Sequence, residues 1–164
     1  FLNIVMPFKD KVFRLAKRIL VSQEEAEDAT QEILLKLWKN KLKIGEYKNI
    51  EAFSMTMTKN FCLDKLKSKH SQNLKIVHSN YQDKNVSLQK QVELNDSVDW
   101  VSKIMEELPE QQKIILQLRD IEQYDFEEIS KMLDMNQTAI RVALSRARKT
   151  LREKLTKTHS YGVK

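Results

Sequence analysis

The feature that most constrains the fold of this chain is the helical spacing of its apolar residues, in a sequence that contains almost nothing to break a helix. Only two glycines and two prolines occur among 164 residues, which leaves little material for the tight turns of β-hairpins. Apolar residues recur one helical turn apart near both ends of the chain, at Phe8, Val12, Leu15 and Ile19 and again at Ile140, Leu144, Ala147 and Leu151. This spacing places each set on one face of an α-helix. The sequence therefore predicts an all-α fold.

The first seventy residues predict three helices that pack as one bundle. Pro7 suits the first turn of the first helix. Ser22 and Glu25 have the spacing of a capping box, which opens a second helix. Asn49 is a favourable N-cap for a third helix over residues 50–69. Along one side of this third helix, Phe53 and Met57 are followed by Asn60, Asp64 and Lys67. This line is interpreted as the core-facing stripe of the helix, which turns polar partway along.

The C-terminal part predicts a second helical unit that ends in a helix-turn-helix. Pro109 stops one helix and starts the next, and residues 120–125 form a short connection. Asp125 is placed to cap a short helix, and Asn136 to cap a longer one directly after it. Between the two units the chain is polar without a clear period, which is typical of a linker. The expected organisation is two small helical domains, an N-terminal bundle at 5–70 and a C-terminal four-helix domain at 96–157, joined by a flexible linker at 71–95.

Charge is distributed unevenly along the chain. Residues 36–75 carry ten basic and three acidic side chains, and residues 136–164 carry eight and one. Residues 76–135, which separate these two basic blocks, carry six basic and thirteen acidic side chains. Either basic block alone could be a solvated helix face. Two such blocks on two helices favour two contacts with one polyanion.

The last helix offers the most specific binding pattern in the sequence. Opposite its apolar stripe it presents polar and basic residues at successive turns. The candidate DNA-binding residues are Gln137, Thr138, Arg141, Ser145, Arg146, Arg148 and Lys149. Arginine supplies forked donors for guanine edges and both basic residue types supply charge for phosphates, as a recognition helix in the major groove requires. The alternative is a basic helix that is merely soluble.

Two segments resemble sigma factors, the promoter-specificity subunits of bacterial RNA polymerase. Residues 27–32 followed by Leu37 and Trp38, with Asn60 and Asp64 on the next helix, resemble the second conserved region of this family. Residues 108–110, 126–129, 138–141 and 145–148 resemble the fourth. Because both regions occur in order and no further domain is evident, the chain is similar to the extracytoplasmic-function (ECF) group. Asp134 stands where the family usually has glycine in the helix-turn-helix turn, and aspartate tolerates left-handed backbone better than most residues.

The resemblance implies a function and sets of site residues. It implies binding to core RNA polymerase and promoter-specific initiation of transcription, in which promoter DNA is recognised and melted. The residues implied in docking on a basic coiled coil of the largest polymerase subunit are Asp28, Gln31, Glu32 and Leu35. Those implied at the minus-ten promoter element are Lys59, Asn60, Asp64, Lys65 and Lys67. Such a site needs stacking surfaces for unpaired bases, for which Tyr47, Phe53 and Phe61 are candidates, although core packing is the favoured role for both phenylalanines. The helix-turn-helix would bind the minus-thirty-five element, and an anti-sigma factor is a further candidate partner.

Other classes of function find little support in the sequence. Cys62 is the single cysteine, so no intramolecular disulfide or cysteine-based zinc site is expected. His70, His78 and His159 lack metal-ligand spacing, and no glycine-rich phosphate loop occurs, so neither a cofactor nor an enzyme activity is expected. No apolar run approaches the ~20 residues that span a bilayer, which predicts a cytoplasmic protein without membrane insertion. The alternative that remains is a helix-turn-helix regulator that acts on DNA without docking on polymerase.

Overall fold

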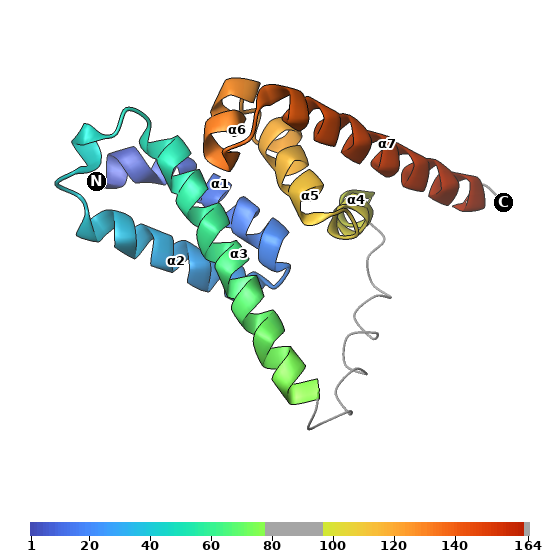
Figure 1. The fold of residues 1–164 in the computed structure, drawn as a ribbon, viewed down its shortest axis with the longest axis horizontal. Helices are drawn as coiled ribbons and strands as arrows, with labels where there is room; N and C mark the ends of the chain where they lie inside the picture. The colour runs from blue at the N-terminus through green and yellow to red at the C-terminus, as the bar shows by residue number, and fades with distance from the viewer. Residues whose placement is uncertain (78–96, 163–164) are drawn as a thin grey trace.

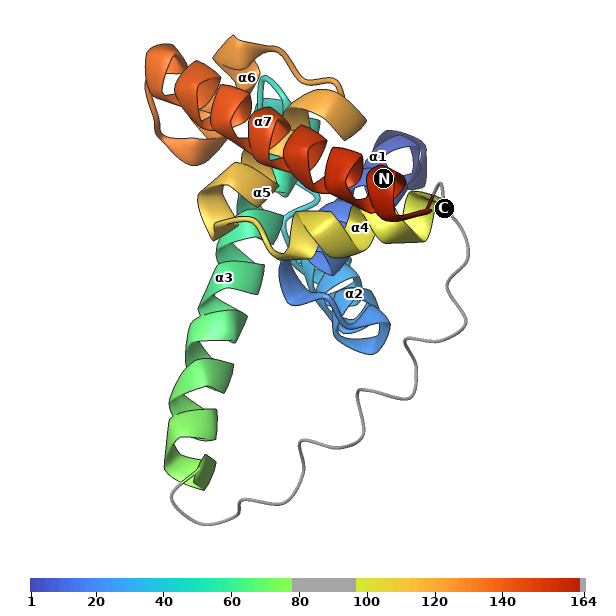
Figure 2. The same ribbon diagram turned by 90° about the vertical axis from the view of Figure 1, so that its right-hand side faces the viewer.

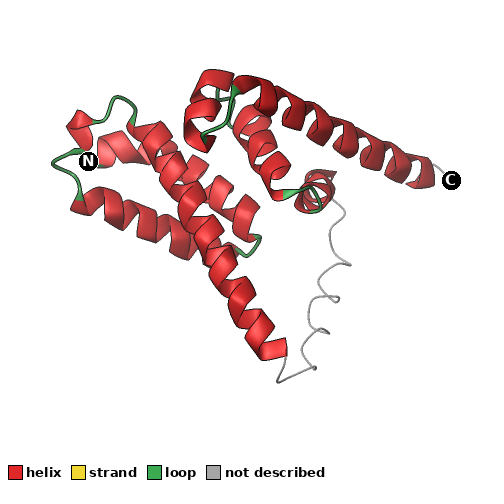
Figure 3. Ribbon diagram, viewed as in Figure 1, coloured by secondary structure: helices red, strands yellow, loops and turns green. Residues whose placement is uncertain are grey.

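The protein is built from helices, as the periodicity predicts. The computed structural model describes residues 1–77 and 97–162, with side chains described for 1–72 and 100–157, and every regular element in these ranges is helical (Figures 1 and 3). The N-terminal elements are α1 (Leu2–Leu20), α2 (Gln23–Lys39), the short 3-10 helix η1 (Ile44–Glu46) and α3 (Ile50–Val77). The C-terminal elements are α4 (Ser97–Glu106), α5 (Glu110–Leu116), the π-helical turn η3 (Gln117–Ile121), α6 (Phe126–Leu133) and α7 (Gln137–Gly162).

Helices α1, α2 and α3 form the N-terminal bundle, and each contacts the other two. At the α1–α2 reversal Val21 takes a positive φ (69°), which is unusual for a β-branched residue. Its N–H bonds to the carbonyl of Lys17 at 2.8 Å and closes the last turn of α1. The Ser22 hydroxyl then accepts a hydrogen bond from the Glu25 N–H at 3.4 Å and starts α2. The predicted α2 cap is confirmed.

Two details of α1 and α3 differ from the expectation. Helix α1 begins at Leu2, so Pro7 lies inside the helix and not at its start. Helix α3 begins where expected but continues to Val77, so the first part of the predicted linker is helical. Its C-terminal half extends beyond the other helices (Figure 2). The rest of the predicted linker, residues 78–95, lies outside the described residues.

The most deeply buried face of α3 is not the predicted core-facing stripe. The residues of α3 that are buried in the bundle are Ser54, Met55, Thr58 and Cys62. The hydroxyls of Ser54 and Thr58 both donate to backbone carbonyls four residues earlier at 2.7 Å. Such internal bonds satisfy a buried hydroxyl, so these polar residues serve as core residues. Of the predicted stripe, Phe53 and Met57 are partly buried against the core, whereas Asn60, Asp64 and Lys67 are exposed.

The C-terminal unit contains the expected helix-turn-helix. Asp125 and Glu128 form a complete capping box at the start of α6. Asp134 ends α6 in the left-handed conformation (φ 53°), and the Asn136 side chain accepts from the Ala139 N–H at 2.7 Å to start α7. The expected connection at 120–125 is shorter than predicted, because helical structure continues through η3 to Ile121.

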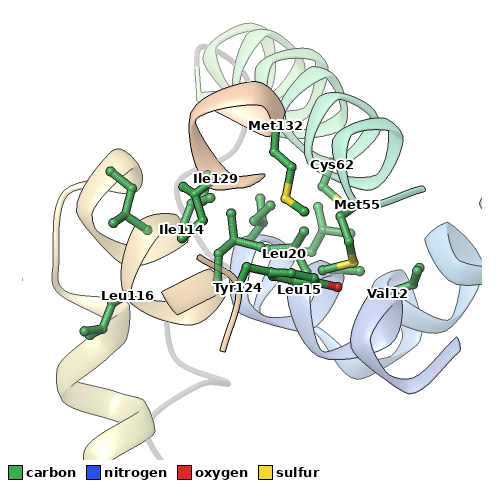
Figure 4. Packing of buried hydrophobic residues seen from close by; sticks show 14 of the residues in the cluster. Val12, Leu15, Leu20, Met55, Cys62, Ile114, Leu116, Tyr124, Ile129 and Met132 are labelled. Carbon is green, nitrogen blue, oxygen red and sulfur yellow. The ribbon is translucent and has the colours of Figure 1, made fainter. Parts of the chain in front are cut away.

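The two units are packed against each other. Helices α1 and α3 of the bundle contact α5, η3 and α6 of the C-terminal unit. Buried apolar residues from both units belong to one cluster (Figure 4). Met132 of α6 lies beside Cys62 and Met55 of α3 in this view, and Tyr124 lies beside Leu15 of α1. The described residues therefore share one continuous core.

Candidate polymerase and nucleic-acid interfaces

One side of α2 is exposed and carries the candidate polymerase-docking residues. Asp28, Gln31, Glu32 and Leu35 are all solvent-exposed, and Leu35 is 51% accessible. The opposite side of α2 is buried through Ala26, Ala29, Ile33 and Leu37. The exposed side thus combines two carboxylates with an uncovered apolar residue, which is suited to a protein surface that is basic at its rim.

A second large apolar residue on this side of the bundle was quoted in the resemblance but was not assigned to the docking surface. Trp38 is 47% accessible and lies one turn beyond Leu35. Its ring packs edge-on against Phe1 at 5.0 Å between centroids, and the Lys41 ammonium lies 4.0 Å from its centroid. The available signal was its spacing of three residues from Leu35, because residues three apart share a helix face.

The outer side of α3 carries most of the candidate minus-ten residues. Asn60, Asp64 and Lys67 are exposed on one face, and Lys65 is half-buried. At the start of the helix, Tyr47 and Phe53 stack with ring centroids 4.3 Å apart and an interplanar angle of 18°. Half-exposed aromatic rings next to polar and basic side chains are the components of a site for unpaired bases. Phe61 lies apart from this stack, under the Lys36 ammonium at 4.8 Å.

Lys59 is separated from the other minus-ten candidates. Its ammonium donates to the carbonyl oxygen of Met132, at the end of α6, at 3.2 Å. Burial lowers the pKa of Lys59. A cavity of about 290 Å³ adjoins this contact and is lined by residues of α3 and of the C-terminal unit. In this conformation Lys59 contacts the other half of the protein.

The recognition-helix candidates lie on the side of α7 that faces away from the core. Thr138, Arg141, Ser145, Arg146, Arg148 and Lys149 are exposed and Gln137 is half-buried. Ile140, Ala143, Leu144 and Ala147 are buried on the other side. The predicted polar and apolar faces of this helix are therefore confirmed, whereas its contacts with DNA stay a prediction.

Two of these arginines have defined neighbours. The Arg141 guanidinium lies 4.8 Å from the centroid of the Phe126 ring and donates to the Gln137 side chain at 3.4 Å. Arg148 makes a bidentate pair with Asp120, with Nε 3.0 Å from Oδ2. The hydrogen bond to Asp120 raises the pKa of Arg148. Arg141 is thus positioned by a ring and a side-chain amide, whereas Arg148 has a carboxylate partner.

A third guanidinium near this face comes from outside the recognition helix. Arg119 of η3 lies 4.5 Å from the centroid of the Phe126 ring, on which Arg141 also packs. Its Nη1 donates to the Tyr124 carbonyl at 2.9 Å. Sequence reasoning missed Arg119 because it follows a buried apolar run and gives no periodic signal of its own.

Three features of the described residues bear on other kinds of chemistry. No group of three or more histidine, cysteine, aspartate or glutamate side chains in these ranges is arranged to hold a metal ion. Among the helices described, none combines the length and the apolar character needed to cross a membrane. Burial raises the pKa of the Cys62 thiol to about 12, which keeps it protonated and unreactive near neutral pH.

The comparisons with known proteins agree with this arrangement. Residues 4–72 match the family model for Sigma-70 region 2, and residues 99–151 match the model for Sigma-70, region 4. Curated protein sequences gave no match. Among solved structures, the fold is similar to that of the sigma factor RpoE from Bartonella quintana, in its co-crystal structure with the anti-sigma factor NepR. The TM-score is 0.73 at 17% identity, over 95% of this chain and 98% of that chain.

The two family matches follow each other in the order expected of a sigma factor. The first covers α1 to α3, and the second covers most of α4 to α7. A regulator with only a helix-turn-helix would account for the second match and leave the first unexplained. The chain therefore belongs to the bacterial RNA polymerase sigma factors of the sigma-70 family, as a member of the extracytoplasmic-function type.

Proposed function

We propose that this sigma factor docks on core RNA polymerase through the exposed side of α2 and contacts promoter DNA through α3 and α7. Region 2 would then comprise residues 5–70 and region 4 residues 96–157. Sigma factors bind core polymerase and direct initiation at promoters, so the proposal concerns which residues do this here. They are transcription factors rather than enzymes, and no catalytic role is proposed for any residue.

The docking surface is the part of this proposal with the clearest support. The four residues Asp28, Gln31, Glu32 and Leu35 are exposed together on α2. A basic partner surface would be attracted by the two carboxylates, which speeds encounter and fixes the relative orientation of the partners. Leu35 would supply an apolar contact, shielded from water, at the centre of this interface.

Promoter contacts divide between the two basic helices. On α3, the Tyr47–Phe53 stack and the exposed Asn60 and Lys67 would hold the unpaired strand of the minus-ten element. On α7, the exposed polar face would enter the major groove at the minus-thirty-five element. Arg141 is the foremost candidate for reading a base, because Phe126 positions its guanidinium while leaving it without a carboxylate partner among the described residues.

Binding to core polymerase by charge-reversed variants tests the docking assignment. Replacing Asp28 and Glu32 together by lysine should weaken core affinity about tenfold or more, mainly through a slower and less salt-dependent association. Helical content should not change, because both side chains are exposed. Glu32→Lys alone can be compared with Glu127→Lys, a matched reversal at a position on α6 whose side chain is 71% accessible. Unchanged core affinity in the double variant would contradict the assignment.

A further partner and a location follow from the same proposal. The RpoE structure contains an anti-sigma factor, so an anti-sigma factor is proposed as a partner of this chain also. Because RNA polymerase is a cytoplasmic enzyme in bacteria, the proposed site of action is the cytoplasm. Purification of the tagged protein from its host, with identification of bound proteins, tests both points.

A further inference from the structure

The cavity of about 290 Å³ beside Lys59 has the composition of a small-molecule site. Its apolar walls come from Leu63 of α3, Ile114 of α5, and Leu133 and Met135 at the end of α6. Sites of this kind are mainly apolar, carry a few polar groups and span ~300–1,000 Å³. This cavity is at the lower end of that range, so its ligand must be small.

Lys59 supplies a positive charge at this cavity. Its ammonium donates to the Met132 carbonyl oxygen at 3.2 Å, and an ammonium has three donors. The Asp134 carboxylate attracts the ammonium electrostatically, without a hydrogen bond. Lys59 can therefore donate to a further acceptor, and a carboxylate is the acceptor that its charge favours.

Glu110 supplies a negative charge to the same cavity. Its Oε1 atom is shielded from solvent and has no hydrogen-bond partner among the described residues, although the side chain as a whole is 41% accessible. The Lys113 ammonium lies 3.6 Å from this oxygen, which is beyond an ordinary hydrogen bond. An acceptor withdrawn from water is destabilised until it meets a donor. Glu110 is therefore suited to an ammonium group on a ligand.

The two charges and the apolar walls together define the chemistry of the ligand. A fatty acid would satisfy Lys59 and leave the Glu110 oxygen without a donor. An alkylamine would satisfy Glu110 and leave Lys59 without an anion. A dicarboxylate would place a second negative charge beside Glu110. A small zwitterion with an aliphatic side chain meets all three requirements, and the lining residues include no aromatic ring that would favour a flat ligand.

We propose that this cavity binds a free aliphatic α-amino acid of about the size of leucine or methionine. Its carboxylate would bind Lys59, its ammonium would bind Glu110, and its side chain would pack against the apolar walls. The site is separate from the proposed polymerase and promoter surfaces, because Lys59 contacts the C-terminal unit and not the exposed minus-ten candidates. The inference therefore goes beyond the proposed function and does not depend on it.

Nuclear magnetic resonance of the full chain, labelled with ¹³C at the methionine methyl groups, tests binding and its location together. The probe is L-leucine. Met135 lines the cavity, whereas Met6 is exposed near the start of α1. L-leucine should shift the Met135 resonance saturably, with a dissociation constant of about 1 mM or below, and leave that of Met6 unchanged. Absence of a saturable Met135 shift up to about 10 mM leucine would overturn the proposal.

Two analogues of leucine that each lack one charge test the two polar contacts. The first, 4-methylpentanoic acid, keeps the carboxylate and the side chain, and the second, 3-methylbutylamine, keeps the amine and the side chain. Each should bind about tenfold or more weakly than leucine, because a charged hydrogen bond is lost and its partner in the protein is left unsatisfied. Equal affinity for leucine and either analogue would overturn the requirement for a zwitterion.

Variants of the protein assign each contact to its residue. Glu110→Gln removes the charge and keeps the shape, so it should abolish the preference for leucine over 4-methylpentanoic acid. Lys59→Met keeps the aliphatic stem and should abolish the preference over 3-methylbutylamine. Glu127→Gln and Lys131→Met make the same changes on α6, where the side chains are 71% and 77% accessible, and should bind leucine as the native protein does. Preferences that survive in the Glu110 and Lys59 variants would overturn the assigned contacts.

A variant that keeps both charges tests the cavity itself. It is needed because Lys59→Met also removes the bond to the Met132 carbonyl. Leu63→Trp enlarges a half-buried side chain in the cavity wall and should weaken leucine binding about tenfold or more, because the added ring occupies the space of the ligand. Circular dichroism checks that each variant retains its helices. Native-like affinity for leucine in a folded Leu63→Trp protein would overturn the location of the site.

Discussion

Replacement of Arg141 by alanine should weaken binding to the minus-thirty-five element by ~1–3 kcal/mol, roughly 5- to 150-fold in affinity. The structure supports the upper part of this range, because the guanidinium is held at 4.8 Å from Phe126 and by Gln137. A side chain positioned before binding loses less entropy when it contacts a base. Fold stability should change little, since Arg141 is exposed.

The contribution of the aromatic support can be measured separately. Phe126→Leu keeps an apolar side chain at a half-buried position but removes the ring that Arg141 packs on. A cation–π contact at such a site contributes ~0.5–1 kcal/mol, so affinity should fall only about two- to fivefold. Lys149→Ala is the matched control, because it removes one positive charge from the same exposed face.

Fluorescence anisotropy with labelled duplexes, at two salt concentrations, distinguishes base reading from phosphate contact. Arg141→Ala should weaken the cognate duplex much more than a scrambled one and relax preference at one or two positions. Lys149→Ala should weaken binding to both duplexes alike. It should also reduce the slope of log affinity against log salt concentration by about the contribution of one phosphate contact. Equal losses on both duplexes for Arg141→Ala would refute the assignment of Arg141 to a base edge.

Three further predictions concern the stability of the helix-turn-helix and of the contact between regions. Asp125→Ala removes the capping box of α6 and should cost about 1 kcal/mol in urea unfolding; an unchanged midpoint would show that the cap contributes nothing. Met132→Ala empties part of the shared core, where this side chain is buried, and should cost ~2–5 kcal/mol in the same assay. Burial acts to raise the pKa of Glu51, but hydrogen bonds from Lys11 and Tyr124 outweigh it and lower the pKa. The stabilisation from Glu51 is therefore complete above the unfolded pKa of ~4.3 and is lost as the pH falls through the folded value. Urea unfolding measured down to pH 3 should show this loss of stability in the native protein, and Glu51→Gln should lack it.

Much of the helical architecture follows from local chemistry that is visible in the sequence. Apolar residues at helical spacing specify which face of α7 is buried, because one α-helix brings residues three and four apart together. The caps at Ser22, Asn49, Asp125 and Asn136 were readable for the same reason, since a cap involves residues within three positions of each other. The order of the two regions was also predictable, because each has its own local pattern.

The buried face of α3 shows where such patterns fail. Ser54 and Thr58 are polar by composition, yet both are fully buried because each hydroxyl bonds to a carbonyl of its own helix. Phe53 is apolar, yet it is only partly buried against the core, and its ring stacks on Tyr47. Periodicity of residue type therefore did not indicate the most deeply buried side of this helix, where burial depends on hydrogen-bond partners as well as on side-chain polarity.

The arrangement of the two regions was decided by tertiary structure alone. Arg14 and Glu122 are 108 positions apart, and neither has a local feature that points to the other. Their pairing depends on the packing of α1 and α3 against η3 and α6, which buries one carboxylate and brings one arginine beside it. The sequence by itself determined two helical regions, their caps and the basic faces of α3 and α7. Only the folded chain placed those regions in one core, because burial and ion pairing over such separations are properties of the whole packing and of no single segment.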